Sequence, residues 1–234
     1  MQLRPIHGER AAPCLRDSAW YDDSECIVTA VSTHCGPPKG PASQSQTVSI
    51  LKSAVDDPGT YVVDVSKRPQ IVTVTSGDFA AHLRQSGAPE AFESSERGAS
   101  AHPIRERQSS FARAILQVLD RRTPDYARDF NHPVELALDQ NPYDRTVGDP
   151  VAFRVLHDGK PAANQLVTVG YRDPQATPAG RVSVYELRTD NQGRSSFVLS
   201  TRGLWYVSVL DMRKSVDTKA DYDATWATMT FRTQ

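Results

Sequence analysis

From residue 147 onward the chain consists of short alternating segments separated by turn-forming residues, and this feature constrains the fold most strongly. Polar and apolar side chains alternate along each segment, and Asp, Asn, Gly and Pro gather in the turns. Such alternation is typical of half-buried β-strands, and turns about 8 to 12 residues apart are typical of an all-β sandwich. We therefore predict a β-sandwich over residues 144–234, with strands at 151–156, 165–171, 182–187, 195–199, 204–210 and 225–232.

The preceding region, residues 46–143, combines strand patterns with one helical pattern. Ser76 can cap a short helix in which Phe79, Ala80 and Leu83 fall at helical spacing, and Gly87 can end that helix. This region contains too few predicted strands for a complete second sandwich. We predict a partial or degenerate β domain with a short helical insertion, with strands at 47–51, 60–65, 70–75 and 134–138.

The stretch 105–122 fits two structures. Phe111, Ala114, Ile115 and Val118 recur at the spacing of a helix, and this spacing favours a helix there. A strand over residues 112–119 is the alternative, because the same apolar run also suits a buried strand.

Residues 1–45 differ in composition from the rest of the chain. They are rich in Pro, Ser, Gly and Asp, and they show no sustained strand or helix periodicity. The three cysteines, Cys14, Cys26 and Cys35, lie in this segment, and their odd number and spacing fit neither a full disulfide set nor a paired zinc motif. We predict that residues 1–45 are irregular and that the cysteines carry no site.

The charge balance limits the classes of partner. Lys and Arg number 27 and Asp and Glu number 28, which gives a formal net charge of −1. Nucleic acids and anionic membranes need a concentrated basic face, so neither is expected as the main partner. No run approaches the roughly 18 to 20 apolar residues of a membrane span, and the first 12 residues lack the apolar core of a signal peptide. We expect no insertion of this chain into a membrane.

Several motifs, taken in order, resemble known families. Gly159-Lys160-Pro161, Thr189-Asp190 with Gly193-Arg194, and Gly203-Leu204-Trp205 resemble the carboxypeptidase-regulatory and transthyretin-like sandwiches, which are immunoglobulin-like in architecture. The wider frame covers roughly residues 55–234 and resembles a bacterial family of domains of unknown function. That family is linked to a periplasmic component of nickel and cobalt uptake and was once described as a nickel-uptake substrate-specific transmembrane region. The wider frame consists of Arg105-Glu106-Arg107, Pro133-Val134-Glu135-Leu136, Asn141-Pro142-Tyr143 and the segment 226–231.

The resemblance implies a periplasmic, non-enzymatic accessory protein that binds or hands over nickel or cobalt. Its implied partner is a membrane metal-uptake permease or another periplasmic protein. Residues 1–45 lack the signal peptide, the His-containing aromatic N-terminus and the strands that members usually carry, so this segment is expected to be foreign to the family fold. Members also often carry a His before the Met that follows the Gly-Leu-Trp strand, and here Asp211 precedes Met212.

The histidines do not form a local chelate, because none of the six stands in an H-x-x-x-H or H-E-x-x-H motif. A metal site must therefore be assembled in three dimensions. His132 precedes a predicted strand, His157 ends another, and Asp211 offers an oxygen donor. Together they predict an imidazole and carboxylate set suited to nickel, cobalt or zinc. The alternative is that both histidines are exposed turn residues.

Other candidate residues favour structural roles. Asp217, Asp221 and Asp223 lack the spacing of a calcium loop and fit a solvated loop better. Trp205 and Trp226 alternate with aliphatic residues and are expected to be core aromatics. The chain contains no nucleophile elbow, phosphate loop or dinucleotide fingerprint, so we expect no enzyme. The alternatives are a structural or protein-interaction sandwich without metal and, less favoured, a hydrolase with a site between domains.

Overall fold

A computed structural model of the chain describes residues 26–28, 57–87, 103–172 and 182–233. The predicted strand at 47–51 lies outside the described residues, as does most of the segment 1–45. The fold is mainly β, as predicted, and the described residues include one α-helix. The elements are β1 (Cys26–Val28), β2 (Gly59–Val74), α1 (Ser76–Ser86), β3 (Ile104–Val118), η1 (Pro124–Ala127), β4 (Val134–Leu138), η2 (Pro142–Asp144), β5 (Pro150–His157), β6 (Lys160–Pro161), β7 (Leu166–Arg172), β8 (Val182–Arg188), β9 (Arg194–Val198), β10 (Gly203–Lys214) and β11 (Tyr222–Thr233).

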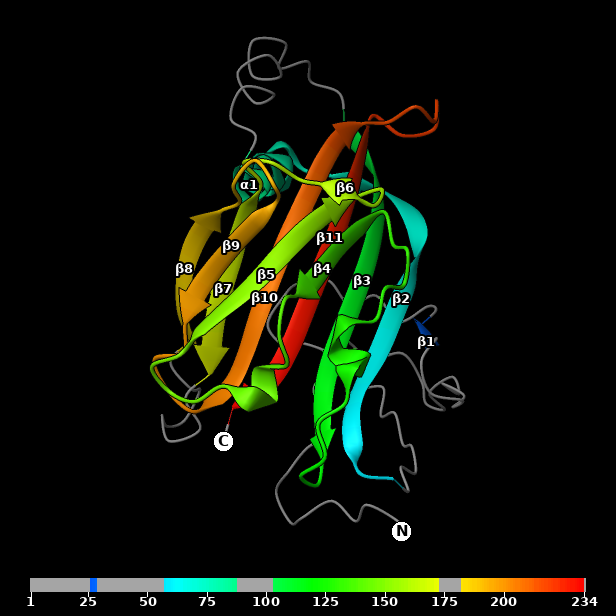
Figure 1. Cartoon of the computed structure of the whole chain (residues 1–234). Coiled ribbons are helices and arrows are strands. Elements are labelled where there is room, and N and C mark those ends of the chain that lie inside the picture. The colour runs from blue at the N-terminus through cyan, green and yellow to red at the C-terminus, as the bar shows by residue number, and fades with distance from the viewer. Residues whose placement is uncertain (1–25, 29–56, 88–102, 173–181, 234) are drawn as a thin grey trace, which may run out of the picture.

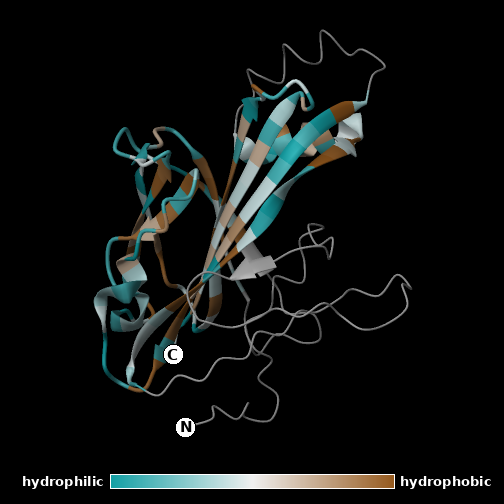
Figure 2. Ribbon diagram, turned by 90° about the vertical axis from the view of Figure 1, so that its right-hand side faces the viewer, coloured by the Kyte–Doolittle hydropathy of each residue, from teal (hydrophilic) through white to brown (hydrophobic). Residues whose placement is uncertain are grey.

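The strands form two layers. The large sheet has the order β1-β2-β3-β11-β10-β7-β8, and the small sheet consists of β4, β5, β6 and β9. Figure 1 shows β4, β5 and β9 in front of the long strands of the large sheet. Seen from the side, α1 lies on the opposite face of the large sheet from the small sheet (Figure 2). Among the described strands β3 and β11 pair in parallel, and the other pairs are antiparallel.

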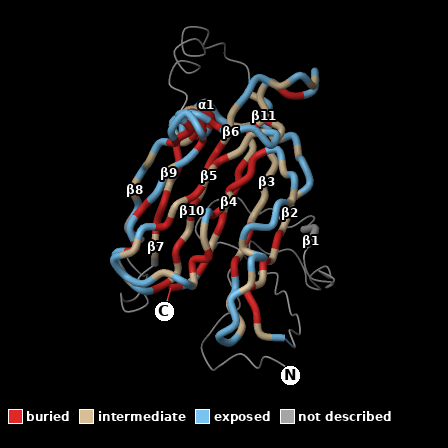
Figure 3. Tube along the Cα trace, viewed as in Figure 1, coloured by how far each residue is buried: buried red, intermediate tan, exposed pale blue. Residues whose placement is uncertain are grey.

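The main core lies between the two sheets. Trp205, Val207 and Val209 alternate along β10 toward the small sheet, and each is at most 2% exposed. Phe153 from β5 and Phe231 from β11 belong to the same cluster. Figure 3 shows the buried positions recurring along the strands that face each other. The predicted strands of the sandwich therefore owe their alternation to this one buried layer.

The strand β2 joins two segments that the sequence separates. Its pairing with β3 shifts by one residue between Lys67 and Gln70, which is a β-bulge. Pro69 lies in the bulge, where a residue without an N–H costs no regular ladder bond. The predicted strands at 60–65 and 70–75 are therefore parts of one 16-residue strand.

The helix favoured for residues 105–122 is wrong, and the strand alternative is closer. Residues 104–118 form β3, which pairs with β2 on one side and β11 on the other. Ile115 faces the core and is 1% exposed, whereas Leu116 is 40% exposed. The two sheet neighbours impose an extended backbone that the local apolar spacing does not reveal.

The helix α1 is confirmed, but its N-cap is Thr75 rather than Ser76. The Thr75 side chain accepts a hydrogen bond from the Asp78 amide at 3.1 Å. Gly87 ends the helix in the left-handed region with φ of 71°. Phe79 and Leu83 lie on the buried face. The helix thus covers part of the outer face of the large sheet, beside β10 and β7.

The division of the chain at 143/144 stays a prediction. The large sheet runs across this position, because β2 and β3 continue the sheet that β11, β10, β7 and β8 form. Val62 of β2 and Ile115 of β3 join the same hydrophobic cluster as Trp205 of β10.

Candidate functional site

His157 and Asp211 meet at one end of the buried layer between the two sheets. His157 is the last residue of β5, and Asp211 follows Val209 on the inward face of β10. The turn after His157 is tight, with Asp158 and Gly159 both at positive φ. This hairpin directs β5 back as β6 and fixes the position of His157 opposite β10. The predicted pair of donors is thereby brought together, with 3.8 Å between His157 Nε2 and Asp211 Oδ1.

The environment of this pair opposes the charged form of each group. The His157 side chain is 20% exposed and that of Asp211 is 15% exposed. Burial lowers the pKa of His157 below its ordinary value, while Asp211 opposes that shift. Burial raises the pKa of Asp211, while His157 and Arg213 oppose that shift. Within the described residues, His157 Nε2 is a buried nitrogen without a hydrogen-bond partner.

Arg213 holds the other oxygen of Asp211. It lies two residues further along β10, on the same face of the strand, with its Nε 2.6 Å from Asp211 Oδ2. Its Nη1 lies 3.3 Å from Asp158 Oδ2, in the turn after His157. The guanidinium thus bridges β10 and the β5–β6 turn. Asp211 therefore presents one oxygen to a cation and the other to an imidazole.

His132, the third predicted ligand, lies in a different cluster. Its Nε2 lies 2.7 Å from Oδ2 of Asp64, a β2 residue whose side chain is 1% exposed. Its ring stacks on Phe111 with 4.3 Å between the ring centroids. The structure therefore does not bring His132 to the pair formed by His157 and Asp211. Nor is His132 an exposed turn residue, because its side chain is 14% exposed.

A buried arginine organises the cluster around His132. Arg113 Nε lies 3.5 Å from Asp64 Oδ1, its Nη2 contacts Glu135, and its Nη1 donates to the Leu136 carbonyl at 3.0 Å. Burial raises the pKa of Glu135, and a hydrogen bond with Asp129 adds to the rise. The cavity among these side chains is about 10 Å³, which is room for one water and not for a substrate. This cluster fastens β4 to the large sheet.

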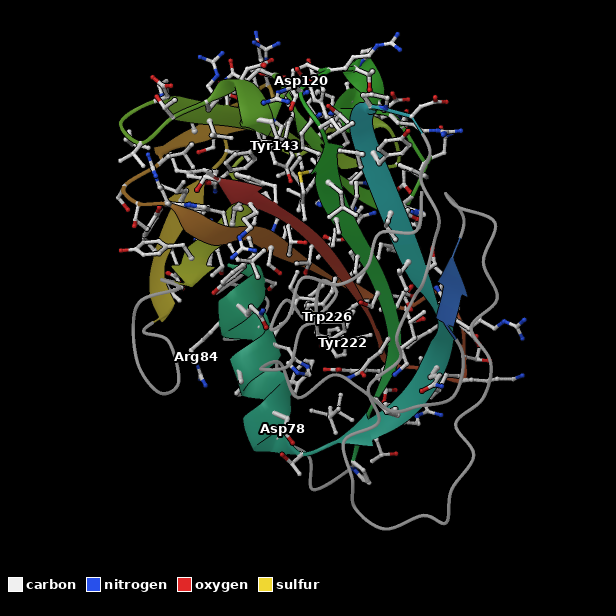
Figure 4. All side chains as sticks on the ribbon, turned by 90° about the horizontal axis from the view of Figure 1, so that it is seen from below. Asp78, Arg84, Asp120, Tyr143, Tyr222 and Trp226 are labelled. Atoms are coloured by element: carbon white, nitrogen blue, oxygen red, sulfur yellow. The ribbon has the colours of Figure 1, made fainter. Side chains whose placement is uncertain are left out.

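A further buried pair lies under α1. His82 Nδ1 is 3.0 Å from both carboxylate oxygens of Glu106, which is fully buried. The His82 ring meets the edge of Trp226 at 5.3 Å, and Phe79 packs on Tyr222 at 4.6 Å. Figure 4 shows Trp226 and Tyr222 between α1 and β3. Trp205 and Trp226 are both buried, as the sequence predicted.

Sequence reasoning missed these two buried clusters for different reasons. His82 stands at helical spacing with Phe79 and Leu83, and that spacing could have placed it on the buried face of α1. Glu106 and Arg113 lie in β3. Because a helix was favoured for this segment, the faces of the strand on which these two side chains lie could not be predicted. Their partners come from elements that are distant in the sequence.

Two of the three acidic residues near the start of the last strand, Asp221 and Asp223, pair with arginines. Asp221 accepts hydrogen bonds from Arg105 Nε and Nη2, and Asp223 accepts them from Arg107. These pairs cross the parallel neighbours β3 and β11. Among residues 57–87, 103–172 and 182–233, no group of three or more His, Cys, Asp or Glu side chains is arranged to hold a metal ion. Metal binding by His157 and Asp211 therefore needs ligands beyond this pair.

A cavity of about 470 Å³ lies beside the end of α1. Its apolar lining comes from Leu83, Leu166 and Leu187. Arg188 at its rim donates to the Asn164 and Gly87 carbonyls, so this guanidinium is already engaged. No imidazole lies among the residues described around it.

The described residues form a β-sandwich, and His157 and Asp211 form an imidazole and carboxylate pair at one end of the buried layer between its sheets. The chain belongs to the family described as a domain of unknown function, DUF4198, whose model matches residues 27–213. The match includes His157, Asp211 and Arg213. No curated protein and no solved structure matches the chain. In the part of the chain that the structure describes, no helix is both long and apolar enough to cross a membrane.

Proposed function

We propose that this protein is a periplasmic, non-enzymatic accessory protein that takes up nickel or cobalt as cargo and passes the ion on. The sequence resemblance supports the periplasmic location and the metal. The receiving partner in this proposal is a membrane metal-uptake permease or another periplasmic protein. The observation that carries the proposal is the buried His157 Nε2, 3.8 Å from Asp211 Oδ1 and without a hydrogen-bond partner among the described residues.

The chemistry of this pair suits a transition metal. A neutral imidazole offers a nitrogen lone pair, and the burial that lowers the pKa of His157 favours the neutral ring. Imidazole with carboxylate is a donor set that nickel, cobalt and zinc accept. Two protein donors leave several coordination positions to water, so we expect reversible binding in the micromolar range. Reversible binding fits a protein that hands its cargo on.

Isothermal titration of the metal-free protein with Ni²⁺, Co²⁺ and Zn²⁺ tests the proposal. We expect one ion per chain for the wild type and no binding for the double variant His157→Ala, Asp211→Asn. The matched control is Asp139→Asn, because Asp139 is another carboxylate paired with an arginine near the small sheet. A separate His132→Ala variant should keep the ion if its fold, checked by circular dichroism, is intact.

The outcomes separate the alternatives. A folded wild type that binds none of the three ions contradicts the proposal. If the double variant still binds the ion and His132→Ala does not, the metal site is the cluster around His132 and not the pair of His157 and Asp211. Equal loss of binding in the Asp139 control shows a general charge effect and also contradicts the proposal.

The second candidate is a protein-interaction sandwich without metal. Within the described residues β8 pairs with β7 along one side and forms the edge of the large sheet. Val184 on β8 is 52% exposed. Exposed edge strands are places where another chain can add a strand. If this candidate is right, the titration shows no metal binding. Replacing Val184 by Lys should then weaken binding of the partner chain to β8.

A further inference from the structure

Arg213 contacts the candidate metal-binding pair, His157 and Asp211, through the carboxylate of Asp211. Its Nε lies 2.6 Å from Asp211 Oδ2, and its Nη1 lies 3.3 Å from Asp158 Oδ2. The Arg213 side chain is 47% exposed, whereas Asp211 is 15% exposed. The carboxylate therefore lies inside and the arginine covers it from the solvent side.

The two oxygens of Asp211 have different neighbours. Oδ2 is held by Arg213, and Oδ1 faces His157 Nε2 at 3.8 Å. An ion that used both carboxylate oxygens would have to displace the guanidinium. An ion that used Oδ1 alone would lie close to a permanent positive charge, since arginine does not lose its proton in proteins. In either case Arg213 competes with the cargo for Asp211.

We propose that Arg213 is a built-in competitor that limits the affinity of the site for a divalent cation and so promotes release of the ion. The inference rests on the proposed function, because it assigns a role to a neighbour of the same pair. Arg213 takes the place of the ion on Asp211 when the ion leaves. The buried carboxylate therefore keeps a cationic partner both before and after the transfer.

The position of Arg213 on β10 supports an exchange of this kind. Residues 211 and 213 lie two apart on one strand and share a face, so the guanidinium reaches Asp211 without a change in the backbone. Its second contact, Asp158, is 68% exposed and offers the guanidinium a resting place away from Asp211. The side chain can thus move between two carboxylates while β10 stays in place.

The test compares Arg213→Gln with Arg213→Lys in the full chain, using isothermal titration with Ni²⁺. Arg213→Gln removes the charge but keeps a hydrogen-bonding side chain, and we expect Ni²⁺ to bind about tenfold more tightly, since a like charge a few ångströms away typically changes affinity by this order. Arg213→Lys keeps the charge and should stay within about threefold of the wild type. Stopped-flow transfer of Ni²⁺ to a chelator should show slower release from Arg213→Gln.

Arg154→Gln is the matched control. Arg154 Nε lies 2.8 Å from Asp139 Oδ1, its side chain is 40% exposed, and its loss changes the net charge equally. Its Ni²⁺ affinity should equal that of the wild type. Unchanged or weaker Ni²⁺ binding by Arg213→Gln, beside a wild type that binds, overturns the role of Arg213 and leaves the proposed function standing. No binding by the wild type or by either Arg213 variant overturns both proposals.

Discussion

Arg113 is a buried cation between two buried carboxylates, and its energetic role differs from that of a surface arginine. Its side chain is 6% exposed, that of Asp64 is 1% exposed and that of Glu135 is 5% exposed. Phe130 covers the guanidinium with 4.5 Å from the Arg113 Cζ to the ring centroid. Removing one member of such a group leaves the others charged and desolvated.

Replacing Arg113 by Leu should therefore lower the free energy of unfolding by about 3 to 5 kcal/mol. Urea denaturation followed by circular dichroism measures this loss. The matched variant is Arg154→Leu, whose exposed pair with Asp139 should contribute only about 0 to 1 kcal/mol. Similar losses of unfolding free energy in the two variants would mean that the buried cluster contributes no more to stability than an exposed ion pair.

The Asp221 carboxylate gives a prediction on pH. Its pKa is lowered chiefly by a hydrogen bond from the Arg105 side chain and then by one from the Arg105 amide. A carboxyl group with a lowered folded pKa stabilises the fold above the unfolded pKa, and this contribution disappears as the pH falls through the folded value. NMR titration should find the pKa of Asp221 below the ordinary range. Arg105→Gln should raise it toward that range, and an unchanged pKa would contradict the pairing.

At the scale of the element, α1 depends on how it ends. Gly87 has φ of 71°, and an added Cβ would lie 2.5 Å from the Cβ of Leu166 on β7. The helix can therefore pack against β7 only because this residue is glycine. Gly77 lies at the other end of α1, where the nearest atom to an added Cβ is the Thr75 hydroxyl oxygen at 3.7 Å.

Gly87→Ala should lower the melting temperature, because left-handed backbone alone costs a residue with a side chain about 1 to 2 kcal/mol and the contact with Leu166 adds to it. Gly77→Ala should leave the melting temperature unchanged or raise it, since alanine is about 0.5 to 1 kcal/mol better than glycine inside a helix. Differential scanning calorimetry compares the two. Equal shifts of the melting temperature in the two variants would show that the close contact with Leu166 of β7 does not require glycine at residue 87.

The elements differ in how far the sequence could predict them. Alternation located β5 and β10 to within a few residues, because the residues that face the core between the sheets are more buried along most of each strand than those on the other face. It failed for β3, which lies between two strands of the large sheet and is only partly covered on either face. The parallel partner of β3 is β11, more than 100 residues further along the chain, and no local pattern carries that information.

At the scale of the whole molecule, the sandwich decides which candidate residues meet. His157 and Asp211 lie on facing strands of the two layers, so their placement follows once the strands are assigned. His132 precedes β4 of the small sheet, and its partner Asp64 lies 68 residues earlier, in β2 of the large sheet. The packing of the small sheet on the large sheet brings β4 close to β2.

The most direct test of metal binding by His157 and Asp211 is to locate the ion in the folded protein. Paramagnetic Co²⁺ added to isotope-labelled protein broadens the NMR signals of nearby residues. We predict broadening centred on the end of β5 and on β10 around Asp211, with the signals of Phe111 and Ile115 unaffected at one equivalent of Co²⁺. Broadening centred on the cluster of His132 and Asp64, or no site-specific broadening at all, would contradict metal binding by this pair.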